Sequence, residues 1–364
     1  MANTFLTVQE IARKALPLLH DNLVFPELIH KEYCEGIGKK GDVVQIRKPT
    51  MYTAKEFDST IDVQDIEESS VLVTLDKIAD VSVELTAKEM ALDLDSFTEQ
   101  VLRPATIAIA EKINKDGLEL YKDIPYTVGE PGSVPSDLAT FANIAKGLND
   151  NKAPLDSRAC VWNTECMASF QSQSSIVDAE KCGSTKALRN GAIGRLIGLD
   201  NYMSQQVYDH KKGTLTGTLK LASAANAGDD EISVSCTSGT LVKGDILTVD
   251  GKNYVVSEDA EASGSTIKAK IYPVVPEGGI ASGTAVKLMD NHAANLAFHK
   301  NAFGFITRPL EKARGAESYV TSFDGISLRV TFDYDIATKK QTMSVDTLYG
   351  FKTLYPELAV RALS

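Results

Sequence analysis

The sequence predicts a mixed α+β protein that carries an inserted run of short strands. Three patterns predict this fold class. Apolar residues recur at helical spacing over residues 8–19 and 96–122, and they alternate strictly over residues 326–336. Between these regions, frequent glycines divide residues 211–289 into short apolar runs. A chain of 364 residues is also longer than one hydrophobic core usually serves, so we expect two or three domains.

The N-terminal third is expected to contain a helical arm, several strands and a long helix. Val8, Ile11 and Ala15 predict that the arm begins as an amphipathic helix. Strand patterns follow at 43–46, 71–75 and 81–85, and we predict that the last two form a hairpin through residues 76–80. Pro104 predicts either one long bent helix over 96–122 or a short helix followed by a long one.

Between these strands, residues 55–70 are charged and nearly free of core candidates. An isolated hairpin buries too little surface to be stable, so we expect this segment to find its partner on another subunit. The charged residues proposed for that contact are Lys55, Glu56, Asp58, Asp62, Asp65, Glu67 and Glu68.

The C-terminal part is expected to form one α+β domain that the insertion divides. Helices are predicted at 136–149 and 163–171, and 292–303 is predicted as helix or turn. Residues 326–336 and 343–347 predict a long antiparallel hairpin. The insertion's strands point to a small all-β barrel or sandwich; they are predicted at 215–221, 231–236, 245–249, 253–256, 266–271 and 285–288.

No catalytic, metal or cofactor motif stands out in the sequence. The five histidines lack metal-ligand spacing, and the five cysteines, odd in number and dispersed, indicate reduced thiols rather than a disulfide framework. Lys243-Gly244-Asp245 has the form of an integrin-type recognition tripeptide, but a turn with glycine at its corner explains it fully. We therefore predict no catalytic residues, no metal and no cofactor, although a hydrolase whose residues converge from distant positions stays open.

Charge and hydropathy exclude other partners. The net charge of -11 disfavours tight binding to nucleic acid and to anionic membranes. No segment approaches the roughly 18 to 20 apolar residues that a membrane span needs, so we expect a soluble, unsecreted chain.

Three stretches, taken in order, resemble a known family. They are MANTFLTVQEIARKALPLLHDNLVF with GKKGDVVQIRKP, then GRLIGLDNYMSQQV, and finally LAFHKNAFGFITRPL with LRVTFDYDIATKKQTMSVDTLYGFKTLYPELAVRAL. Together they resemble the major capsid (coat) proteins of tailed bacteriophages, of the Salmonella podovirus coat type.

The resemblance implies the Hong Kong 97 capsid fold and a division of the chain. Residues 1–35 would be the N-terminal arm, and 36–95 the extended two-stranded loop with the start of the peripheral domain. Residues 96–149 would be the spine helix and peripheral domain, 150–210 with 290–364 the axial domain, and 211–289 an inserted β domain. No motif identifies the residues that cross-link the shells of some relatives.

The resemblance also implies a function and partners. The protein would self-assemble through pentamers and hexamers into an icosahedral shell around packaged double-stranded DNA, which it would touch only non-specifically. Its other partners would be a scaffolding protein and a portal at one vertex, and a decoration protein could bind as well. The shell would assemble in the host bacterial cytoplasm, and the protein would end in the virion.

Two acidic segments of the insertion are predicted to touch neighbouring subunits. Their residues are Asp229, Asp230, Glu231, Glu258, Asp259 and Glu261. The alternative from another functional class is a β-rich phage tail or adhesin protein with the insertion as receptor binder. This alternative predicts an exposed aromatic patch that binds the receptor. The only aromatic residues of the insertion are Tyr254 and Tyr272, which counts against it.

Overall fold

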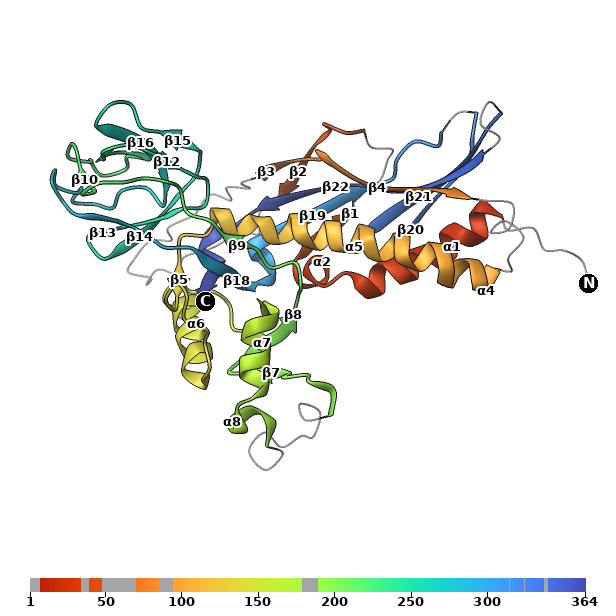
Figure 1. The fold of residues 1–364 in the computed structure, drawn as a ribbon, viewed down its shortest axis with the longest axis horizontal. Coiled ribbons are helices and arrows are strands. Elements are labelled where there is room, and N and C mark those ends of the chain that lie inside the picture. Colours follow the sequence, from red (N-terminus) through yellow and green to blue (C-terminus); the bar gives the residue numbers. More distant parts are fainter. Residues whose placement is uncertain are drawn as a thin grey trace, which may run out of the picture. The chain divides into compact units, whose positions relative to one another are not determined.

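The computed structural model describes residues 7–33, 39–47, 70–85, 94–178, 189–313, 315–323, 325–336 and 340–364 (Figure 1). The chain folds as two compact units. The first contains Met1–Leu23, Lys31–Ile113 and Gly304–Leu354, and the second contains Val24–His30, Asn114–Phe303 and Tyr355–Ser364. The mixed α+β class is confirmed, whereas the five-part domain division remains a prediction.

A long antiparallel hairpin lies in the middle of the sheet of the first unit. Strand β21 (Ile326–Asp335) pairs with β22 (Lys340–Thr353), and Phe332 lies opposite Met343. The predicted hairpin is confirmed, although β22 continues beyond the expected return strand. Its predicted turn includes residues 337–339, which lie outside the described residues.

The predicted hairpin between residues 71–75 and 81–85 is wrong. Strand β3 (Ser70–Thr74) pairs with β2 (Val43–Arg47), whereas β4 (Lys77–Leu85) pairs along its whole length with β22. The longer strand β22 offers β4 nine cross-strand partners, more than the five residues of β3 could supply. Strands β2 and β3 form a separate two-stranded sheet.

The remaining strands of this unit extend the same sheet. The strand order is β1 (His30–Tyr33), β19 (Phe303–Arg308), β22, β21 and β20 (Glu317–Phe323). Helix α1 (Val8–Asn22) packs on β20 and β21, as Figure 1 shows. Thr7 caps its first turn by accepting a hydrogen bond from the Glu10 N–H, and Ile11, Ala15 and Leu19 are buried. The predicted amphipathic helix is confirmed.

The stretch predicted as helix over residues 96–122 is helical without a break from residue 94 to residue 123, and the type of helix changes along it. The sequence of segments is α4 (Leu94–Phe97), the π-helical η1 (Thr98–Leu102), α5 (Arg103–Leu118) and the 3-10 helix η2 (Glu119–Asp123). Pro104 lies in the first turn of α5, where a missing N–H breaks no α-helical hydrogen bond of that helix.

A seven-stranded sheet forms the centre of the second unit. Its path is β5 (Thr127–Val128), β23 (Ala359–Leu363), β18 (His292–His299), β6 (Arg158–Trp162), β8 (Leu199–Met203) and β7 (Arg195–Leu196), and β9 (Asp209–His210) also pairs with β18. The helical segments of this unit are α2 (Phe25–Leu28), α6 (Leu138–Asp150), α7 (Thr164–Gln171), α8 (Ser174–Val177), η3 (Lys300–Ala302) and η4 (Pro356–Leu358). Helices α6 and α7 confirm two predictions.

The helix or turn predicted for residues 292–303 is wrong over most of its length. Strand β18 lies between β23 and β6, and all eight of its residues are buried. A strand covered on both faces shows no alternation, and its alanines resemble a helix in the sequence. Burial in the sheet overrides that local preference.

Residues 211–289, called the insertion segment below, form two antiparallel sheets. One has the order β10 (Lys220–Leu221), β11 (Glu231–Ser235), β16 (Thr266–Tyr272), β14 (Lys252–Val256), β13 (Ile246–Val249) and β17 (Val286–Leu288), and the other pairs β12 (Thr240–Leu241) with β15 (Ala260–Glu261). Five of the six predicted strands are confirmed; of 215–221, only the last two residues form a strand.

The insertion segment has its own apolar core. Tyr254 is buried among mostly aliphatic side chains that include Val234, Leu247 and Ile267. That this segment behaves as a separate domain remains a prediction, because its residues belong to the second compact unit together with the seven-stranded sheet.

The two Lys-Gly-Asp sequences form the same turn. Gly41 and Gly244 have φ angles of 96° and 98°, a conformation that favours glycine. In each turn the Asp carboxylate, Asp42 or Asp245, accepts a backbone N–H from three residues earlier at 2.8 Å. Asp245 is only 1% exposed, so the second sequence is a structural turn and not an accessible recognition tripeptide.

Candidate functional site

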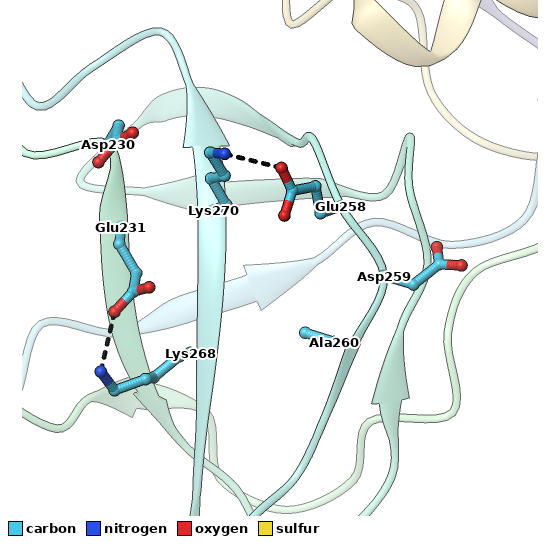
Figure 2. A pocket seen from close by; sticks show the side chains of 7 residues that line it. All are labelled: Asp230, Glu231, Glu258, Asp259, Ala260, Lys268 and Lys270. Carbon is cyan, nitrogen blue, oxygen red and sulfur yellow. Dashed lines mark hydrogen bonds and ion pairs between the residues drawn. The ribbon is translucent and has the colours of Figure 1, made fainter.

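The two predicted contact sites differ in what the structure describes. Residues 55–68, which contain all seven charged positions of the polar loop, lie outside the described residues. The acidic residues of the insertion segment are all described, and four of the six line one open groove: Asp230, Glu231, Glu258 and Asp259. We call this surface the acidic groove. Ala260, Lys268 and Lys270 complete its lining (Figure 2).

Strand pairing creates the groove. Glu231 on β11 lies opposite Lys270 on β16 in the antiparallel register. Along β16 the residues alternate between buried and exposed, which places Lys268 and Lys270 on the solvent side. The Ser257 N–H donates to the Lys270 carbonyl at 2.9 Å, and this bond brings the segment containing Glu258 beside the two strands.

The other two predicted acids do not line the groove. Asp229 accepts the Asn226 N–H at 2.7 Å and so fixes the turn before β11. Glu261 lies in β15 opposite Thr240. Their positions indicate structural roles in a turn and a short sheet.

Two ion pairs cross the acidic groove. Lys270 Nζ lies 2.7 Å from Glu258 Oε1, and Lys268 Nζ lies 3.1 Å from Glu231 Oε1. Figure 2 shows both lysines directed toward these partners, while Asp259 points away from them. The hydrogen bond and charge of Glu258 raise the pKa of Lys270 above its usual value. Four carboxylates surround two ammonium groups, so the groove is net negative.

The lining of the acidic groove consists of charged side chains and one alanine. It contains no histidine, cysteine or hydroxyl group, and the described residues contain no group of three or more His, Cys, Asp or Glu side chains placed to hold a metal ion. Exposed carboxylates and lysines at a protein surface set the orientation and register of a contact more than its affinity.

Sequence reasoning missed the two lysines. The only available signal was the pattern of Thr266–Tyr272, in which lysines alternate with Ile267, Ala269 and Ile271. It also missed a buried polar group around Arg361, to which residues of β23, η2, β9, β18 and the turn at Gly244 contribute. Cys160, Cys166 and Cys236 are free and buried, and no described helix is long and apolar enough to cross a membrane.

Comparison with known proteins shows what the chain is similar to. Residues 240–363 match the family described as P22 coat protein, gene protein 5. No curated protein matches the chain. A structure from Mycobacterium phage Che8 is 18% identical, with a TM-score of 0.52 over 93% of this chain and 90% of that one.

Other solved structures are more distant. The capsid structure of the cyanophage P-SCSP1u is 12% identical, with a TM-score of 0.48 over 94% of this chain and 88% of that one. The mature capsid of bacteriophage PhiM1 is 10% identical, with a TM-score of 0.44 over 94% of this chain and 86% of that one. The family match of residues 240–363, together with the fold shared with a phage protein over nearly the whole chain, confirms the resemblance in the sequence to the major capsid proteins of tailed phages.

Proposed function

We propose that this capsid protein assembles through pentamers and hexamers into an icosahedral shell that encloses double-stranded DNA. The observation that carries the proposal is the match of residues 240–363 to the P22 coat protein family. Identical subunits can close into such rings through head-to-tail contacts, in which one surface of a subunit binds a different surface of its neighbour. The net charge of -11 suits a container that must not hold its DNA tightly.

The proposal extends to partners and location. A scaffolding protein would direct assembly, a portal would occupy one vertex, and a decoration protein could bind outside. Assembly would take place in the host bacterial cytoplasm, and the protein would act without catalysis or cofactor.

Two surfaces would contribute subunit contacts. The polar loop, with its charges between Lys55 and Glu68, would gain pairing by lying on a neighbouring subunit. The acidic groove would receive a basic segment of a neighbour. Because Glu258 and Glu231 are half or more exposed, these charges would chiefly fix register and would weaken as salt is raised.

The assembly proposal is tested by electron microscopy. The full chain, alone and with the small acidic or helical proteins encoded beside it, would be examined by negative stain and light scattering. We expect closed shells or rings of five and six subunits. A stable monomer or small oligomer under every condition would contradict assembly and favour the alternative of a receptor-binding module.

A charge reversal tests the acidic groove. Asp230→Lys is expected to weaken the groove contact about two- to fivefold, because one exposed charge pair contributes at most about 1 kcal/mol. Glu277→Lys makes the same charge change at an exposed position of the insertion segment outside the groove. The measurement is the assembled fraction by light scattering at low and at high salt. Equal assembly by both variants at low salt would show that the groove forms no contact.

A further inference from the structure

The insertion segment leaves and rejoins the seven-stranded sheet through one two-stranded neck. Strands β9 and β18 pair there, with His210 opposite His292. Just beyond the pair, the Lys212 N–H donates to Asn291 Oδ1 at 2.9 Å, and Lys212 Nζ lies 2.5 Å from Asp290 Oδ1. The two chain segments that connect the insertion segment to the sheet therefore lie side by side. Two paired strands alone would not fix the orientation of the insertion segment on the sheet.

A buried arginine lies beside this neck. Arg361 on β23 is fully buried, and its guanidinium donates to the carbonyl oxygens of Gly244 at 2.9 Å, Tyr121 at 2.6 Å and Ile124 at 3.2 Å. The guanidinium carbon also lies 4.9 Å from the centre of the Tyr121 ring. One side chain thus joins the sheet, the segment after α5 and a turn of the insertion segment.

A buried carboxylate of the insertion segment, that of Asp245, contacts residues of the neck. Asp245 accepts the Gly213 N–H at 3.1 Å and 3.2 Å, and His210 Nε2 lies 2.9 Å from its Oδ1. His210 Nδ1 in turn lies 3.0 Å from the Tyr121 hydroxyl. Because Tyr121 also contacts Arg361, these residues form a closed circuit. With His292, whose Nε2 lies 3.4 Å from Arg361 Nη1, we call them the Arg361 cluster.

The Arg361 cluster is separate from the core of the insertion segment. The apolar core contains none of its five residues. Weaker contacts flank the cluster: Lys243 Nζ lies 3.0 Å from Asp123 Oδ1, and Asn253 Nδ2 donates to Thr127 Oγ1 at 2.7 Å. The cluster therefore lies outside the apolar core of the insertion segment, although Asp245 also forms one of its turns.

We propose that Arg361 is a positioning residue that holds the insertion segment in one orientation on the seven-stranded sheet. Its hydrogen bonds are charge-assisted and shielded from water, so they are stronger than the exposed contacts around them. Every subunit then presents the acidic groove in the same direction. That consequence for assembly rests on the proposed function, whereas the fixed orientation does not.

Hydrogen exchange of the full chain tests the proposal. Arg361→Met keeps most of the apolar stem and removes every donor. We expect amide exchange to rise at least about tenfold in the neck, residues 209–213 and 289–292, since loss of one such bond exceeds about 1.4 kcal/mol. Exchange in β11, β14 and β16 should stay unchanged. Arg195→Met is the matched control, because Arg195 is half exposed at 55% and contacts Asp200 at the surface.

Each outcome decides the proposal. Unchanged exchange in the neck would overturn it, and so would equal acceleration in the neck and in the insertion strands, which would make Arg361 a general core residue. If Arg361→Met does not fold, Tyr121→Phe removes only the hydroxyl that contacts His210, and a selective, smaller rise in neck exchange is expected. Assembly is a separate measurement, so a chain that never forms shells would refute the proposed function and leave this inference standing.

Discussion

Replacing Trp162 with alanine is expected to lower the free energy of unfolding by about 3–5 kcal/mol. Trp162 is 1% exposed at the end of β6, a strand buried along its whole length. Its ring centre lies 4.9 Å from that of Phe170 and 5.5 Å from that of Phe141, so the indole joins α7, α6 and the sheet. Removing it leaves a cavity where three elements meet.

Urea denaturation followed by circular dichroism would measure this loss. Trp162→Phe keeps an aromatic ring but loses the Nε1–H donor to Asn201 Oδ1 at 2.9 Å, and we expect a smaller loss of about 1–2 kcal/mol. Leu155→Ala, at a side chain that is 73% exposed, should change stability by less than about 0.5 kcal/mol. A Trp162→Ala variant as stable as Leu155→Ala would contradict the packing described above.

Local periodicity predicted those parts of the fold in which one face of an element is buried. The helix at α1 and the strand at β21 follow this rule, and both are confirmed. Strand β18 does not, because it is covered on both faces and its residues HAANLAFH carry no alternation. Pairing between distant strands was also hidden: β3 and β4 both read as strands, but β3 pairs with β2 and β4 pairs with β22.

The candidate site was predictable in part for a similar reason. Runs of acidic residues mark exposed segments, so Glu231 and Glu258 could be named from the sequence. Their shared groove depends on the register of β11 with β16, which no local pattern determines. Arg361 offered one weak signal: it is a single charge among the apolar residues of AVRAL, and in the structure that strand is fully buried. Its partners Tyr121 and Gly244 are far away in sequence and could not be inferred.

The stability of the chain is expected to fall as the pH is lowered from about 6.5 to about 4, and His292 should account for part of this fall. His292 is 4% exposed, and its Nδ1 lies 2.8 Å from the Asp290 carbonyl oxygen, which places a proton on Nδ1. Nε2 then faces Arg361 without a proton. The pKa of His292 is lowered to about 4: burial is the main cause, the charges of Arg361 and His210 act in the same direction, and the hydrogen bond to the Asp290 carbonyl opposes the shift.

The sign of the effect follows from which state binds the proton. Below pH 6.5 the unfolded chain protonates His292, whereas the folded chain resists protonation until about pH 4. The stability associated with a neutral His292 is therefore fully present above pH 6.5 and is lost as the pH falls toward 4. For this pKa difference the loss amounts to about 3 kcal/mol.

His292→Gln removes the titrating group at similar size. Urea denaturation at intervals between pH 7 and pH 4 should show a flatter decline for this variant than for the original chain, even if its stability at pH 7 is lower. Burial also lowers the pKa of His299, so His299→Gln should flatten the decline as well, and the double variant should flatten it more than either. If His292→Gln declined as steeply as the original chain, the buried neutral histidine beside Arg361 would not be the source of acid sensitivity. The acid lability would then come from other titrating groups.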